Sequence, residues 1–259
     1  MTTGPVAPQE ARRDRLHLEV FAVLGVSFGI SALGAFLSLL RDELTTPGGI
    51  GAQTKCIECP PVTVHRWLDL ADQLVGILSG IVPPLLALLL LARVPGGPGF
   101  GVGFDLRQKA RDAAQGIGFT ALIGIPGLAL VYVANQLNIN ATLEAVSYPD
   151  YWYRIPYLLL SAFQNGFAEE IVVTAYLLTR LRQLGWTNER ALLAESTLRG
   201  SYHLYQGYGG FAGNFVMGLI FGWWFQRTRR VVPLVIAHFL LDAFSFIGYV
   251  YLHGRIDWI

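Results

Sequence analysis

Five residues that can move protons interrupt apolar stretches in the second half of the chain. They are Glu169 and Glu170 in one stretch, His203 in a second, and His238 and Asp242 in a third. A charged side chain at membrane depth costs about 2.5–3.5 kcal/mol on insertion scales, so such groups usually face a polar interior and do chemistry or transport. The set therefore predicts a polar site enclosed by apolar segments.

These residue types fit the chemistry of hydrolysis. A carboxylate and an imidazole that converge on one water molecule can remove its proton, which is general-base activation for attack on a carbonyl group. A second histidine, with a carboxylate one helical turn away, can direct a donor toward the developing oxyanion. Neither cysteine of the chain lies near the set. Peptide-bond hydrolysis without a nucleophilic serine or cysteine is therefore the predicted reaction.

Helical spacing sorts the polar residues of the first stretch into two stripes. Asn165 and Glu169 are four residues apart, and so are Glu170 and Thr174. Residues four apart lie on the same face of a helix. Each glutamate is thus expected to have its own polar face.

The second and third stretches carry one stripe each. Arg199 precedes His203 by four residues, and His238 precedes Asp242 by four. Burying these stripes against each other is the least expensive arrangement in lipid. A purely structural alternative is that interhelical hydrogen bonds hold a bundle together. For so many ionisable groups in three helices, a functional site is the favoured interpretation.

The elements that position this set are predicted to be membrane helices. Hydrophobic residues make up 53% of the 259 residues and charged residues 14%, with a mean hydropathy of +0.45. Largely uncharged stretches long enough to cross a bilayer recur along the chain. The predicted fold is an all-α polytopic bundle of about seven spans, or eight, the seven being about 20–40, 70–92, 113–137, 155–179, 191–207, 209–226 and 231–252.

The basic residues set the expected orientation. With the N-terminus in the cytoplasm, 13 of the 19 lysines and arginines fall in inside segments and 5 in outside segments, while Arg199 lies within a span. This asymmetry follows the positive-inside rule. Residues 1–15 are expected to be a disordered cytoplasmic tail. Residues 16–259 are expected to form one membrane domain, with the catalytic core helices in 155–252.

The two cysteines and the distribution of the basic residues give further information about which functions the chain can have. Cys56 and Cys59 lie in a predicted outside loop, where they form a disulfide, stay free thiols, or have a redox or metal-binding role. The basic residues occur in short clusters between spans, so no nucleic-acid partner is predicted.

The order and spacing of the three polar stretches resemble those of the CPBP family, the CAAX protease and bacteriocin-processing (Abi) intramembrane endopeptidases. These include the eukaryotic prenyl-protein "Ras-converting" protease. The resemblance covers about residues 155–250 and rests on the Glu-Glu, His and His-x-x-x-Asp patterns. It implies that Glu169 and His203 activate the water, that His238 and Asp242 bind the oxyanion or orient the carbonyl, and that Glu170 is a supporting carboxylate.

The chain departs from the family pattern at two positions. Thr174 stands where the first motif has arginine, and Arg199 stands where the second motif has phenylalanine. We hypothesise that the two changes compensate, so that an arginine lost from one helix and gained on its neighbour still neutralises the glutamate pair.

No cofactor is expected from the sequence. One glutamate and two histidines could ligate zinc in a three-ligand site, but the chain has no His-Glu-x-x-His spacing. A metal-free water is therefore favoured over a zinc-bound one.

The predicted function is an intramembrane endopeptidase acting on a membrane-bound peptide or protein. Its predicted location is the lipid bilayer of a prokaryotic plasma membrane. One alternative is a non-catalytic membrane scaffold or binding protein on the same fold, supported by the missing motif arginine. Another is a proton-coupled transporter, because intramembrane Glu and His also build proton relays.

Overall fold

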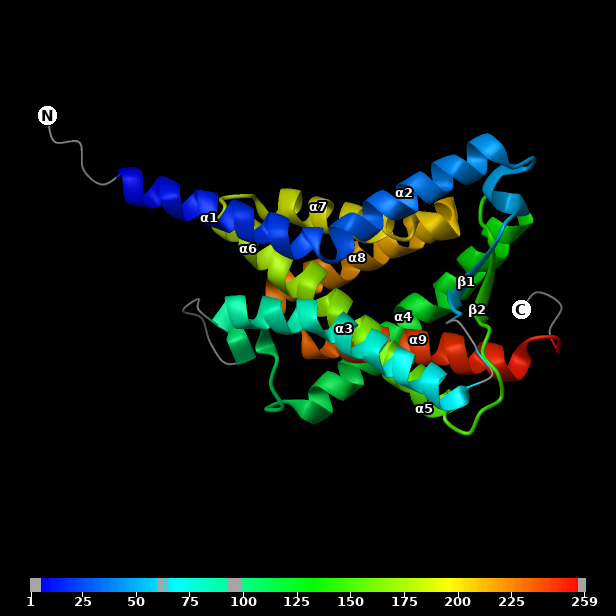
Figure 1. Ribbon diagram of the computed structural model, residues 1–259. Helices are drawn as coiled ribbons and strands as arrows, with labels where there is room; N and C mark the ends of the chain where they lie inside the picture. The colour runs from blue at the N-terminus through cyan, green and yellow to red at the C-terminus, as the bar shows by residue number, and fades with distance from the viewer. Residues whose placement is uncertain (1–5, 60–62, 64, 93–98, 256–259) are drawn as a thin grey trace, which may run out of the picture.

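The protein is a bundle of helices with a small two-stranded sheet at one end (Figure 1). The computed structural model describes residues 6–59, 63, 65–92 and 99–255. The α-helices in chain order are α1 (Val6–Gly25), α2 (Phe28–Thr45), α3 (Arg66–Ala92), α4 (Lys109–Gln136), α5 (Arg154–Glu169), α6 (Leu178–Gln183), α7 (Asn188–Ser201), α8 (Tyr208–Thr228) and α9 (Val232–Leu252).

Shorter elements join these helices. They are the 3₁₀ turns η1 (Gly49–Ala52) and η4 (Leu204–Gln206), the π-helical segments η2 (Gly99–Gly103) and η3 (Glu170–Leu177), and the strands β1 (Thr54–Glu58) and β2 (Thr142–Val146). The all-α character predicted from the sequence is confirmed. The small sheet was not foreseen, because neither strand has the alternating pattern of a longer one.

Three helices, α3, α4 and α9, are long and apolar enough to cross a membrane. A fourth span results if α1 and α2 are counted as one, although they are bent by 52° at the break between them. Helix α7 has 14 residues, fewer than the roughly 20 that a transmembrane helix needs. The number of seven spans therefore stays a prediction.

Two boundaries expected from the sequence are wrong. Residues 6–15 belong to α1 rather than to a disordered tail, because this segment has three arginines, two alanines and no glycine, and its one proline, Pro8, lies in the first turn. Residues 1–5 lie outside the described residues. The predicted span 191–207 ends early, since α7 stops at Ser201. The chain then turns toward Gly207, whose φ of +114° favours glycine.

The centre of the bundle is the continuous segment α5–η3–α6. Helix α5 packs against α9, α9 also packs against α4, and α7 packs against α8. Nearly every residue from Gly166 to Leu181 is buried, as expected for a helix surrounded on all sides. The π-helical stretch η3 begins at Glu170, and π-type distortions of helices occur frequently at functional sites.

The sheet closes one end of the bundle. Strands β1 and β2 run parallel, with Thr54 opposite Thr142 and Glu58 opposite Val146. They lie near the C-terminal part of α9 in Figure 1, and β2 contacts that helix. A segment far from the site in sequence is thereby placed beside the helices that carry the polar stripes.

Candidate active site

Arg199, in the last turn of α7, is the centre of a buried charge cluster. Its side chain is fully buried, and its Nη1 lies 2.8 Å from Glu170 Oε1 and 3.5 Å from Glu169 Oε2. Its Nε lies 3.4 Å from Oε1 of Glu195, one turn earlier on the same helix. One guanidinium thus faces three carboxylates. This arrangement suits arginine, because its planar group presents five donors in a fixed fork.

The same guanidinium reaches Thr174, the position where the family pattern has arginine. Arg199 Nη2 donates to Thr174 Oγ1 at 2.8 Å. That hydroxyl lies 2.8 Å from Glu170 Oε2 and 3.2 Å from Glu195 Oε1, and it can donate its single proton to one of them at a time. The structure therefore places the cation of α7 directly beside residue 174 of η3.

His238 of α9 faces the glutamates from the opposite side. Its Nδ1 lies 2.8 Å from Glu170 Oε1, and its Nε2 lies 3.9 Å from both Glu169 Oε2 and Asp242 Oδ1. Helices α5 and α9 come this close because of Gly166. A Cβ there would lie 2.9 Å from the Phe239 backbone nitrogen and 3.2 Å from the His238 Cβ.

Glu169 keeps one oxygen for a further ligand. Tyr202 donates its hydroxyl proton to Glu169 Oε2 at 2.6 Å, and Arg199 contacts the same oxygen. Among the described residues no hydrogen bond to Oε1 occurs, and Glu169 retains 8% of its exposure whereas Glu170 retains none. The Oε1 atom is therefore available to accept a proton from water.

His203 has a defined tautomer. Its Nδ1 lies 3.0 Å from the Arg199 backbone carbonyl, one turn earlier. A carbonyl oxygen can only accept, so Nδ1 carries the proton and Nε2 of the neutral ring is an acceptor. The imidazole is thus prepared to take a proton.

Asp242 and Asn165 lie nearer the surface of the protein than the charge cluster around Arg199. Their side chains are hydrogen-bonded to each other, and the Asp242 carboxyl group keeps 25% of its side-chain exposure. The four polar stripes expected from the spacing therefore come from α5–η3, α7 with the turn after it, and α9.

Two members of the cluster were not in the predicted site. Glu195 is fully buried and accepts from Ser196 Oγ at 3.1 Å as well as from Arg199. Its position four residues before Arg199 was a usable signal. Tyr202 had no comparable signal beyond its place next to His203, because its contact with Glu169 depends on how α7 meets α5.

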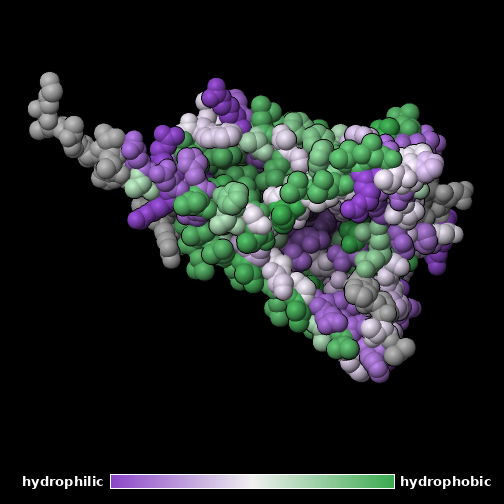
Figure 2. Space-filling view, turned by 45° about the horizontal axis from the view of Figure 1, so that its top comes forward, coloured by the Kyte–Doolittle hydropathy of each residue, from purple (hydrophilic) through white to green (hydrophobic). Residues whose placement is uncertain are grey.

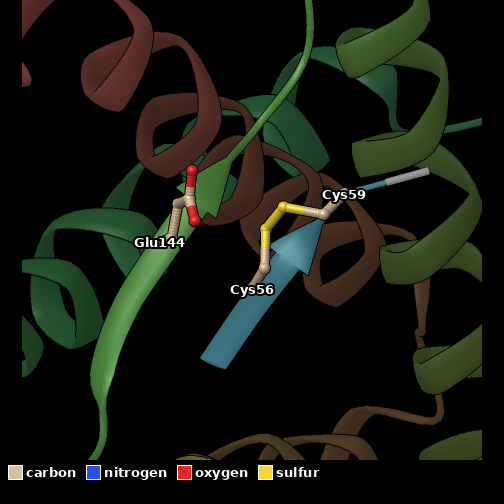
Figure 3. A group of neighbouring side chains, drawn as sticks. All are labelled: Cys56, Cys59 and Glu144. Carbon is tan, nitrogen blue, oxygen red and sulfur yellow. A yellow bond between two sulfur atoms is a disulfide. The ribbon is translucent and has the colours of Figure 1, made fainter. Parts of the chain in front are cut away.

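In the arrangement that the structure shows, the potential ligand atoms of the Arg199 cluster do not fit a zinc ion. Within the part of the chain that the structure describes, Cys56, Cys59 and Glu144 are the only trio of His, Cys, Asp or Glu found with ligand atoms within 4.8 Å of one another (Figure 3). The parallel register pairs Cys56 with Glu144, which accounts for that trio, and the two cysteines are joined in a disulfide. Glu169 and Glu170 instead face a guanidinium, which repels a dication.

The surface is hollowed beside the sheet. Figure 2 shows a depression with a hydrophilic floor, between the α2 and α3 sides of the molecule and next to β1. Much of the surrounding surface is hydrophobic, as expected for a face in lipid.

The comparison with protein families agrees with this geometry. Residues 151–244 match the family described as type II CAAX prenyl endopeptidase Rce1-like, a segment that contains the helices and side chains of the buried cluster. Over this segment the predicted resemblance to the CAAX proteases is confirmed. The family and the apolar helices together indicate an integral membrane protein. No curated protein and no solved structure matches the chain.

Proposed function

We propose that the protein is an intramembrane endopeptidase in which Glu169 and His203 activate a water molecule. The observation that carries the proposal is the buried convergence of Glu169, Glu170, Arg199 and His238 from α5–η3, α7 and α9, within a segment that matches an endopeptidase family. Groups this costly to bury are retained where they do chemistry.

The first step is attack by water on the scissile carbonyl carbon. The water donates a hydrogen bond to Glu169 Oε1 or His203 Nε2, the two acceptors without another hydrogen bond among the described residues. One of them takes the proton as the oxygen–carbon bond forms. His238, protonated at Nε2 and supported by Asp242, donates to the resulting oxyanion.

The second step breaks the carbon–nitrogen bond. The proton taken from water is delivered to the leaving nitrogen, and the bond breaks to give a carboxylic acid and an amine. The proton of the acid then passes to the amine, so the final products are a carboxylate and an ammonium group. Glu170 takes no part in proton transfer in this scheme. It holds Nδ1 of His238 and is itself neutralised by Arg199, which keeps the imidazole in place.

The substrate class and topology complete the proposal. The substrate is a membrane-bound peptide or protein, cut in the lipid bilayer. The chain crosses a prokaryotic plasma membrane about seven times with its N-terminus in the cytoplasm, as the distribution of basic residues favours. No cofactor is required in this mechanism.

The test is cleavage of a library of membrane-bound peptides co-reconstituted with the protein in vesicles. Glu169→Gln and His203→Ala should each lower the rate about 10²–10⁴-fold, because each removes one proton acceptor. Glu144→Gln, on the sheet, is the matched control and should cleave as the wild type does. Normal turnover in either site variant would contradict the water-activation roles. Peptide binding without any cleavage would favour the scaffold alternative.

Chelation tests the metal-free mechanism. Activity should survive exhaustive treatment with a strong chelator, since the proposed steps use only side chains and water. Loss of activity that zinc restores would overturn this part of the proposal.

A further inference from the structure

Glu58, the last residue of β1, lies beside helix α5 although its two hydrogen-bond partners there are 99 and 103 residues away in sequence. Its Oε1 accepts from Ser161 Oγ at 2.6 Å, and its Oε2 accepts from the Tyr157 hydroxyl at 3.0 Å. Ser161 precedes Asn165 and Glu169 by four and eight residues on α5. Glu58 therefore caps the outer end of the stripe whose inner end is the proposed base.

The Glu58 carboxylate lies near the polar side chains of the site. It is close enough to interact electrostatically with Asp242 and with Tyr205 of η4. Tyr205 in turn interacts with Glu169 and Asp242. The hydrophilic hollow of Figure 2 lies next to β1, the strand that ends at Glu58. Glu58 is thus placed where a substrate would approach the water.

Glu58 differs from the deeper carboxylates in having no cation. Arg199 neutralises the inner glutamates, whereas among the described residues no ion pair involves Glu58. It is half-buried, and its two hydrogen bonds use two of about four lone-pair sites. A partly desolvated carboxylate with neutral partners attracts a cation that arrives from outside.

The backbone around Glu58 is held in place. Glu58 lies between Cys56 and Cys59, which the disulfide joins. Its carbonyl accepts from the Ser147 backbone nitrogen at 3.2 Å, and it pairs with Val146 of β2. Preorganisation of this kind is what a recognition group needs, because little ordering remains to be done when the substrate binds.

We propose that Glu58 determines substrate specificity by receiving a lysine or arginine side chain of the peptide, on the β1 side of the scissile bond. This inference rests on the proposed function for its substrate class. It adds a requirement for a positive charge at one substrate position, which the catalytic set does not impose.

The test measures binding rather than turnover. Membrane-inserted peptides are made in sets of three that carry lysine, glutamine or glutamate at one position near the bilayer surface. Their dissociation constants are measured with wild-type protein, Glu58→Gln and Glu58→Lys in nanodiscs. Glu144→Gln is the matched control, because it removes a carboxylate from the neighbouring strand of the same sheet.

The wild type and the control should bind the lysine peptide roughly tenfold more tightly than the glutamate peptide. Glu58→Gln should bind all three almost equally, and Glu58→Lys should reverse the order. Equal binding of the three peptides by the wild type would overturn the inference. So would a uniform loss of affinity in Glu58→Gln together with a lower Tm, since that is the signature of a structural role.

The two proposals fail separately. A charge preference without cleavage of any bound peptide would overturn the proposed function and leave the recognition role intact. Cleavage that is indifferent to the charge, in wild type and Glu58→Lys alike, would overturn the recognition role alone.

Discussion

The site has an inner and an outer region that handle buried charge in different ways. In the inner region, Glu169, Glu170 and Glu195 surround one guanidinium and are 8% exposed or less. In the outer region, Glu58 accepts from two neutral hydroxyl groups and Asp242 from Asn165, with His238 Nε2 3.9 Å from Asp242, and both carboxylates remain partly exposed. Within the site, the arginine lies among the deeper carboxylates.

The difference follows from desolvation. An ionised group loses several kcal/mol of hydration when it is fully buried, and only close opposite charge and hydrogen bonds offset this. A partly exposed carboxylate keeps some hydration, so hydroxyl donors suffice. The inner region is therefore fixed in one arrangement, while the outer region stays open to a substrate. Four variants test this contrast.

The largest effect is expected for Arg199→Ala. It leaves buried carboxylates without a cation and should lower the free energy of unfolding by about 3–5 kcal/mol and abolish cleavage. Adding Thr174→Arg should restore part of both, because the Arg199 guanidinium already lies 2.8 Å from the Thr174 hydroxyl. Thermal unfolding and cleavage of the two single variants and the double variant form a double-mutant cycle.

Arg227→Ala is the control for this cycle, since Arg227 stacks on Trp223 outside the cluster. It should unfold and cleave nearly as the wild type does. Tolerance of Arg199→Ala, or no coupling between positions 174 and 199, would contradict the compensation hypothesis.

A smaller effect is expected for Gly166→Ala, at the contact between the two regions. The added methyl group would lie 2.9 Å from the Phe239 backbone nitrogen and push α9 with His238 away from α5. Overpacking of this kind costs about 1–3 kcal/mol. The turnover number should fall more than the Tm suggests, because His238 moves relative to Glu170. Gly118→Ala is the control, as a Cβ there meets nothing within 4 Å.

Asp242→Asn should affect catalysis with little change in stability. The side chain is part of the outer region, and its distance of 3.9 Å from His238 Nε2 makes it a supporting group. Asparagine keeps the shape and can still hydrogen-bond Asn165. We expect about a tenfold fall in turnover, less than the roughly 10²–10⁴-fold contributed by a group that itself transfers the proton, with an unchanged Tm. A loss of several kcal/mol in stability would show that this carboxylate belongs with the inner cluster.

The smallest effect on stability is expected for the double variant Cys56→Ser/Cys59→Ser. The disulfide closes a loop of only four residues, so its contribution to stability is about 2 kcal/mol or less. If Glu58 recognises a cation, the variant should bind lysine and glutamate peptides more alike, while its cleavage of neutral peptides stays unchanged. A collapse of all activity would instead place the loop in the catalytic framework.

Several features of the site were predictable because they depend on local spacing. The pairs Arg199–His203 and His238–Asp242 are four residues apart, and a helix places such residues on one face whatever surrounds it. Glu195 could have been found by the same rule from Arg199. Other features were not predictable. The end of α7 at Ser201 and the contact of Tyr202 with Glu169 depend on how neighbouring helices meet, which periodicity does not encode.

The sequence by itself determined that ionisable residues occupy regular positions in apolar helices, and that Thr174 and Arg199 both depart from the family pattern. Only the tertiary structure decided that the Arg199 guanidinium lies beside Thr174, and that Glu58 reaches α5 from a distant strand. The physical reason is the difference in the distance along the chain over which the two properties are set. Hydrophobic and polar periodicity is a property of a few helical turns, whereas the neutralisation of a buried charge depends on which side chains the packing brings within about 4 Å.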